Sequence, residues 1–155
     1  MPLWYRASRA AGIGEILYLK HNLLVESALP KLLQVKDKEL KQQIVAAYQA
    51  PHPFPDDRIG ILRFTRMVPH RMGDESFDEI GEIDAALHQL DVPAHALWAR
   101  KDPAFRKAIA HAFMASLPQG DPSHIIDLPQ AGHFLQEDEP ETINDHLRAI
   151  LGIKA

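Results

Sequence analysis

Val92-Pro93-Ala94-His95-Ala96-Leu97-Trp98-Ala99 is the stretch that decides the fold. The run is apolar over most of its length, with neither helical spacing nor polar alternation, and this pattern predicts a buried strand. The strand stops at Arg100-Lys101-Asp102-Pro103. A helical segment follows, and then Ser123-His124-Ile125-Ile126-Asp127-Leu128 predicts a second strand, which ends where Pro129 and Gly132 break it. Two parallel strands joined by a helix are therefore expected.

Asp102 and His133 each lie just past the carboxyl end of one of these strands. In an open α/β sheet this edge is where functional sites are built, so we expect the two side chains to lie close together. A carboxylate beside an imidazole can fix its tautomer and stabilise it when it takes a proton. The pair would supply two members of a catalytic triad. Two plainer interpretations are that Asp102 caps the following helix and that His133 is an exposed loop residue.

Two segments carry a family resemblance. Leu97-Trp98-Ala99-Arg100-Lys101-Asp102-Pro103 resembles the penultimate strand and acid turn of α/β-hydrolases, and Ala131-Gly132-His133-Phe134-Leu135-Gln136-Glu137 resembles their histidine loop. The triad of that fold runs in the order nucleophile, acid, histidine, which Asp102 and His133 respect. Ala99 stands where the family usually has glycine. The larger departure is that neither G-x-S-x-G nor a glycine-flanked aspartate elbow occurs in the 155 residues.

The residues ahead of the first strand predict helices only. A complete α/β domain alternates strands and helices throughout, so four helices in succession are not expected of one. The predicted helical segments are 15–33, divided or kinked at Pro30, a helix with Asp37 as N-cap, a helix opened by Asp56-Asp57 and closed by Pro69, and a helix from about Ser76 to Leu90.

Residues from about Gly12 to Pro69 resemble the helical cap of α/β-hydrolases. Three segments within them resemble the cap of haloalkane dehalogenases: 24–30, 48–58 and 63–69. The resemblance implies an α/β fold made of the C-terminal part of an α/β-hydrolase. Residues 1–72 would form the helical cap segment. Residues 73–155 would form the C-terminal portion of the core, with a helix, strand 92–99, a helix, strand 123–128 and a last helix.

The resemblance also implies a mechanism for a complete relative. A carboxylate would displace halide to give an alkyl ester, and His133, oriented by Asp102, would activate water to hydrolyse it; no cofactor is required. The substrate would be small and apolar. Candidate substrate-binding residues are Phe64, Met67, Trp98 and Phe134, each of which could instead serve packing alone.

Three alternatives remain open. Within the fold, an epoxide hydrolase usually carries a tyrosine on its third cap helix, whereas Gly60-Ile61-Leu62-Arg63-Phe64 has none. An esterase would need a serine nucleophile. If the chain is not an enzyme, it could be a noncatalytic truncated remnant or an association module. Because no nucleophile is present, we predict that the chain alone is close to inactive.

Composition and charge limit the classes of partner and cofactor to be expected. With 46% hydrophobic and 25% charged residues the chain can bury one ordinary core. A net charge of -4 and an isoelectric point near 6.1 argue against nucleic acid. The chain has no cysteine, no histidine pair with convincing zinc spacing, no leader-like start and no apolar run of membrane-spanning length, so no metal, no membrane and a cytoplasmic location are expected.

The inner edge of the strand at Val92 should pair with a strand that these residues do not contain. We expect either a homo-oligomer or a polypeptide carrying the missing N-terminal half to satisfy this edge, the remaining possibility being a partly unfolded monomer.

Overall fold

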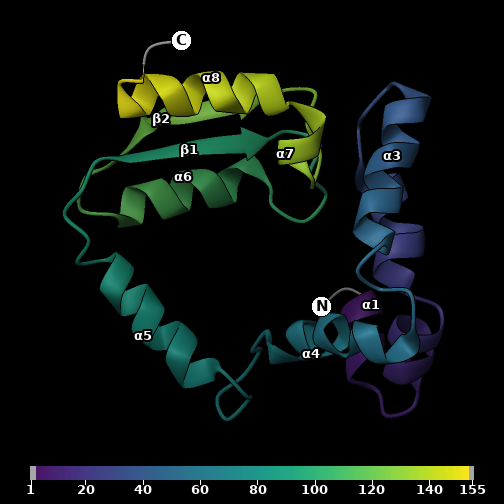
Figure 1. The fold of residues 1–155 in the computed structure, drawn as a ribbon. Coiled ribbons are helices and arrows are strands. Elements are labelled where there is room, and N and C mark those ends of the chain that lie inside the picture. The colour runs from purple at the N-terminus through teal and green to yellow at the C-terminus, as the bar shows by residue number, and fades with distance from the viewer. Residues whose placement is uncertain (1–2, 154–155) are drawn as a thin grey trace. The chain divides into compact units, whose positions relative to one another are not determined.

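A computed structural model describes residues 3–153, with side chains from Arg6 onward. The chain divides into two compact units, each described here by itself. The first holds the residues up to Pro30 together with Gln42–Ala86, and the second holds Lys31–Lys41 together with the chain from Leu87 onward. Figure 1 shows the elements of both.

The first unit is helical. Its core surrounds Tyr18, which is fully buried with Val25, Leu29 and Leu62 as further buried apolar residues. α1, the π-helix η1 and α4 contact one another. The helical elements that lie in or begin in this unit are α1 (Leu3–Arg9), η1 (Glu15–Lys20), the π-helix η2 (Leu24–Ala28), α2 (Leu29–Leu32), the 3-10 helix η3 (Pro55–Arg58), α4 (Ile59–Met67) and α5 (Phe77–Leu87).

The helix predicted over 15–33 is interrupted at Asn22 and not at Pro30. Asn22 has a φ of 46°, a left-handed conformation that asparagine tolerates better than most residues. Its carbonyl oxygen accepts the backbone N–H groups of Val25 and Glu26, which starts the next helical turn. Pro30 lies in the first turn of α2, where its missing N–H removes little.

α3 (Lys38–Gln49) confirms the predicted N-cap. Asp37 Oδ1 accepts the backbone N–H of Glu39 at 2.8 Å and of Leu40 at 2.9 Å.

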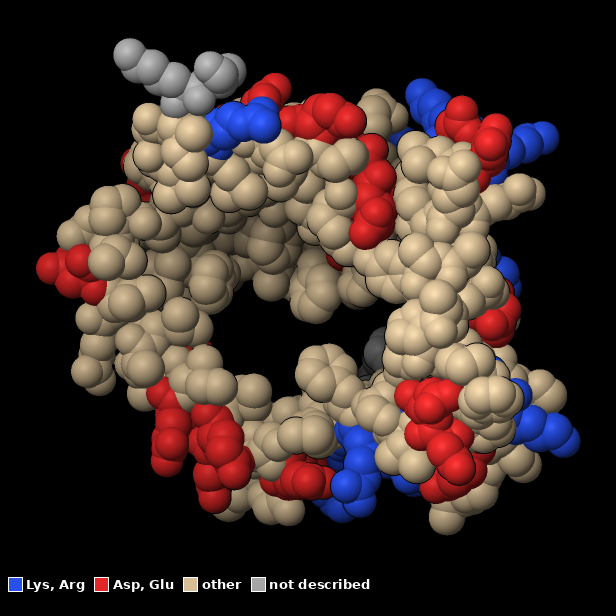
Figure 2. Space-filling view, viewed as in Figure 1, with Lys and Arg blue, Asp and Glu red and all other residues tan. Residues whose placement is uncertain are grey.

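Acidic side chains gather along α5, as Figure 2 shows. Asp78 and Glu79 lie in its first turn, where their negative charge stabilises the positive end of the helix dipole.

The second unit contains a two-stranded parallel sheet. Both predicted strands are confirmed, although β1 begins after Pro93, which cannot donate a backbone N–H, and β2 begins three residues early at Gly120. Ala96 pairs with Ile125 and Ala99 with Leu128. The elements are β1 (Ala94–Ala99), α6 (Lys107–Ser116), β2 (Gly120–Leu128), α7 (Leu135–Asp138) and α8 (Pro140–Leu151).

Helices cover both faces of this sheet (Figure 1). α6 packs on one face and contacts both strands. On the other, Ile143 of α8 packs against a cluster of Ala99, Leu128 and Ala131. The architecture is thus α/β with a small parallel sheet, as predicted. Among residues 3–153 no strand pairs with the outer edge of β1, which is the edge away from β2 and the one expected from the sequence to need a further strand. None of the helices described is both long and apolar enough to cross a membrane.

Candidate active site

The turn after β1 and the loop after β2 are joined by a backbone hydrogen bond. The N–H of Lys101 donates to the carbonyl oxygen of Ala131 at 3.0 Å. Lys101 also reaches the loop through its side chain, which donates to Gln130 Oε1 at 2.8 Å. Because these two segments lie side by side at the carboxyl ends of their strands, Asp102 and the histidine two residues after Ala131 are brought together.

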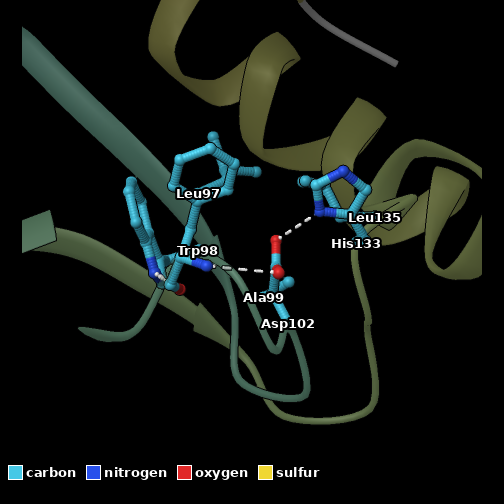
Figure 3. A pocket seen from close by; sticks show the side chains of 7 residues that line it. Leu97, Trp98, Ala99, Asp102, His133 and Leu135 are labelled. Atoms are coloured by element: carbon cyan, nitrogen blue, oxygen red, sulfur yellow. Dashed lines mark hydrogen bonds and ion pairs between the residues drawn. The ribbon is translucent and has the colours of Figure 1, made fainter. Parts of the chain in front are cut away.

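Asp102 binds His133 directly, as predicted from their positions. Asp102 Oδ2 lies 2.9 Å from His133 Nδ1 (Figure 3). The carboxylate is nearly buried, with 7% of its side chain exposed, and the imidazole is 35% exposed. Water therefore competes poorly for the carboxylate, while one side of the imidazole remains accessible.

The second carboxylate oxygen of Asp102 shapes the turn. Oδ1 accepts the backbone N–H of Ala104 at 2.7 Å and of Phe105 at 3.2 Å. α6 begins only at Lys107, with Arg106 as its N-cap, so Asp102 organises the preceding turn and does not cap the helix itself. The same residue thus holds its own backbone and the imidazole.

Aromatic rings fix the orientation of the imidazole. Phe105 stacks on His133 with 5.9 Å between ring centroids and 6° between planes, and Phe134 meets the imidazole edge-on at 5.3 Å and 86°. Within the described part of the chain, Nε2 has no hydrogen-bond partner. A proton on Nδ1, donated to Asp102, leaves the lone pair of Nε2 free to accept a proton.

A pocket of about 210 Å³ opens beside this pair. Asp102 and His133 are its charged or titratable members, and the remainder of the lining is apolar or aromatic. Figure 3 shows these side chains around the pocket. The apolar lining residues are Leu97, Trp98, Ala99, Phe105 and Leu135.

Of the two predicted substrate-binding residues that lie in the second unit, one lines the pocket. Trp98 does, with its indole N–H donated to the carbonyl oxygen of Phe105 at 2.8 Å. Phe134 contacts the imidazole but is not among the lining residues. Phe64 and Met67 belong to α4 of the first unit, where 75% and 41% of their surfaces are exposed, and their role in substrate binding stays a prediction.

Sequence reasoning missed four residues that line the pocket, namely Leu97, Ala99, Phe105 and Leu135. Phe105 stacks on the imidazole from the turn that Asp102 organises, and Leu135 lies two residues after His133. Their closeness in sequence to the pair was the available signal. Among the residues described, no group of three metal-binding side chains is arranged to hold an ion.

The chain is similar to known hydrolases over most of its length. No protein-family model matches the chain. The chain is 31% identical over 133 residues to an uncharacterized hydrolase, YugF, of Bacillus subtilis. The matched residues make up 84% of this chain and 44% of that protein. It is 30% identical over 142 residues to a haloalkane dehalogenase of Mesorhizobium japonicum. That match makes up 90% of this chain and 43% of the dehalogenase.

A third relative has another activity in its name. A cis-3-alkyl-4-alkyloxetan-2-one decarboxylase of Shewanella oneidensis is 26% identical over 149 residues, 96% of this chain and 45% of that protein. The chain therefore spans about half the length of the curated relatives it matches.

Solved structures give the same picture. A putative ancestral haloalkane dehalogenase, AncHLD2, superposes with a TM-score of 0.82 and 31% identity over 96% of this chain and 50% of its own. Haloalkane dehalogenase DbeA from Bradyrhizobium elkani gives a TM-score of 0.80 and 28% identity over 96% and 50% of the two chains. The fold is thus that of α/β-hydrolases, matched over half of their length.

Proposed function

Since the chain belongs to the haloalkane dehalogenase-like group of α/β-hydrolases, we propose that it supplies the base and the orienting carboxylate for hydrolysis of a carbon–halogen bond. The observation that carries the proposal is the 2.9 Å contact between Asp102 and His133 beside an apolar pocket. His133 would be the general base, and Asp102 would hold its tautomer and stabilise the imidazolium.

The reaction needs a carboxylate nucleophile that these 155 residues do not present in a recognisable elbow. That carboxylate attacks the halogen-bearing carbon, the halide leaves with the bonding electrons, and an alkyl ester forms. Nε2 of His133 then takes a proton from water while the oxygen attacks the ester carbonyl. Collapse of the adduct expels the alkoxide, which takes the proton from the imidazolium of His133 and leaves as the alcohol, while the remaining proton of the water passes to solvent and the carboxylate is restored. The apolar lining would favour both a small apolar substrate and a poorly solvated nucleophile.

The outer edge of β1 is where we place the missing group. A parallel strand added there would bring its carboxyl end to the same sheet edge as Asp102 and His133. α6 also exposes Ile109 and Phe113, at 46% and 43%, as expected of a helix that covers a wider sheet. The occupant would be chain carrying the other half of the hydrolase core, on the same or a separate polypeptide.

The substrate class depends on that nucleophile. An aspartate would suit haloalkanes, epoxides or the oxetanone substrate that the Shewanella relative's name states. A serine would favour esters. We place haloalkanes first because dehalogenases recur among the relatives and the structures. If no completing half exists, the chain would be a noncatalytic remnant or association module.

The first test is made on the native material. Intact mass and light scattering show whether a second polypeptide accompanies the chain, and halide release from 1-chlorobutane and 1-bromobutane measures turnover. We expect the chain alone to release halide no faster than buffer, because loss of a triad member slows such enzymes by about 10^4-fold or more. Measurable turnover by the pure chain would contradict the proposed division of the site.

The second test supplies the missing half. The amino-terminal half of the Mesorhizobium dehalogenase is co-expressed with this chain, and halide release is measured on the purified complex. We expect turnover that His133→Ala abolishes and that His111→Ala leaves unchanged, because His111 is an exposed residue of α6. A stable complex that is inactive toward haloalkanes, epoxides, oxetanones and esters would favour the association module. Turnover insensitive to His133→Ala would overturn the role of His133.

A further inference from the structure

Asp138, the last residue of α7, joins two segments of the chain, one nearby in sequence and one 104 positions before it. Its Oδ1 accepts the backbone N–H of Gln34 at 2.6 Å. Its Oδ2 accepts the backbone N–H of Gly132 at 2.7 Å. Hydrogen bonds to an ionised carboxylate are stronger than those between neutral groups, so one side chain clamps both segments firmly.

The two clamped segments lie in close backbone contact. A Cβ atom added to Gly132 would lie 2.6 Å from the carbonyl oxygen of Leu32, closer than such atoms approach. Gln34 adds a hydrogen bond from its side-chain amide to the same carbonyl, at 3.2 Å. Residues 32–34 therefore form a support against which the loop before His133 rests.

The loop has a second anchor on its other side. Ala131, fully buried, accepts the backbone N–H of Lys101 from the turn that carries Asp102. The two anchored residues, Ala131 and Gly132, directly precede His133. Its backbone is therefore fixed at Ala131 relative to the acid and at Gly132 relative to residues 32–34.

We propose that Asp138 is a positioning residue for His133, which sets the distance of the imidazole from Asp102 by holding Gly132 against residues 32–34. Its carboxylate bonds backbone N–H groups, while the imidazole itself is bonded by Asp102. A carboxylate suits this task because each oxygen accepts one donor, whereas a side-chain amide would turn its NH2 group toward one of the two N–H groups. The inference deepens the proposed function, since it concerns the geometry of the proposed base, but its test needs no catalysis.

The test compares Asp138→Asn with the unaltered chain by NMR. The readouts are hydrogen exchange of the Gly132 and Gln34 amides and the resonance of the His133 Nδ1 proton that faces Asp102. We expect both amides to exchange at least about tenfold faster, and the Nδ1 proton resonance to shift or disappear. A purely structural role would change the amides and the urea midpoint but not the imidazole signal. An unchanged Nδ1 resonance would overturn the inference.

Glu139→Gln is the matched control. Glu139 neighbours Asp138, and its Oε1 accepts the backbone N–H of Gln130 at 3.1 Å from the same loop. The variant removes the same charge but keeps an acceptor for its single donor, so the His133 signal should stay unchanged. If both variants alter the imidazole equally, the effect is one of net charge and the inference fails.

Gln34→Pro covers the case in which Asp138→Asn does not fold. Gln34 lies in irregular chain between α2 and α3, and proline removes its backbone N–H while Asp138 stays intact. We expect the Nδ1 resonance to shift here too. An imidazole signal identical to that of the unaltered chain would show that residues 32–34 do not position His133.

Discussion

At the scale of single residues, Asp102 shows how one carboxylate serves structure and chemistry at once. Oδ1 holds the turn through Ala104 and Phe105, and Oδ2 holds His133. The two functions respond differently to substitution, because an asparagine keeps one acceptor oxygen whereas an alanine keeps none.

We predict that Asp102→Asn leaves folding nearly unchanged while Asp102→Ala lowers the free energy of unfolding by about 1–2 kcal/mol, since two backbone N–H groups lose their acceptor. Urea unfolding of both variants measures this. In the completed enzyme both should lower kcat, by about 10^4-fold for the asparagine variant. Equal stability of the two variants would contradict the role of Oδ1.

Tyr18 makes a prediction about pH. The side chain is fully buried. Burial raises the pKa of its hydroxyl above the ordinary value of 10.0, and hydrogen bonds to Ser8 and Thr65 offset part of that rise. A raised folded-state pKa means that stability is fully present below about pH 10 and declines as pH rises toward the folded-state value.

We therefore expect the free energy of unfolding to fall above about pH 10 and Tyr18→Phe to reduce that fall, although the variant loses two hydrogen bonds at neutral pH. Urea unfolding at pH 8 and pH 10.5 gives the difference. Tyr48→Phe, on α3, is the comparison variant against which the slope of Tyr18→Phe is measured. A slope that Tyr18→Phe leaves intact would assign the fall to other groups.

At the scale of elements, the connection from α6 to β2 depends on glycine. A Cβ atom on Gly120, where β2 begins, would collide with the carbonyl oxygen of Met114 in α6. Gly81, in the middle of α5, has nothing within 4 Å of the equivalent position. Replacing glycine by alanine should therefore affect stability in opposite directions at Gly120 and Gly81.

We predict that Gly120→Ala lowers the free energy of unfolding by about 1–3 kcal/mol, because the backbone must shift to remove the collision. Gly81→Ala should instead raise it by up to about 1 kcal/mol, since alanine is the better helix former. Thermal or urea unfolding of the pair provides the measurement. Two substitutions of equal effect would contradict the packing of α6 against β2.

At the scale of the whole molecule, the second unit leaves a strand edge and many apolar side chains exposed. The outer edge of β1 is unpaired among the described strands. Exposed apolar residues of α6 and α8 are Ile109, Phe113, Leu147, Ile150 and Leu151. A free strand edge beside apolar surface favours association.

We expect the chain without its completing half to self-associate, with a weight-average molar mass that rises with concentration in light scattering. Phe113→Lys on α6 should reduce that rise by placing a charge in the apolar surface, whereas His111→Lys on the same helix should not. A monomer with a sharp melting transition at every concentration would contradict the expectation.

Local sequence determined much of this protein. Apolar runs, turn residues and helical spacing predicted both strands, the N-cap at Asp37 and the helices α3 to α6 and α8, because these depend on neighbours within a few positions. Chain order at the sheet edge predicted the meeting of Asp102 and His133, since parallel strands end together.

Tertiary structure decided the rest. It brings Phe105 onto His133, forms the lining of the pocket and places Asp138 against Gln34. The local sequence around each of these residues does not predict which partner it contacts. Phe134 shows the converse, because an aromatic residue predicted to bind substrate contacts the imidazole but is not among the residues lining the pocket. Sequence periodicity specifies which face of an element is apolar, but side-chain packing over long sequence separations specifies what that face contacts.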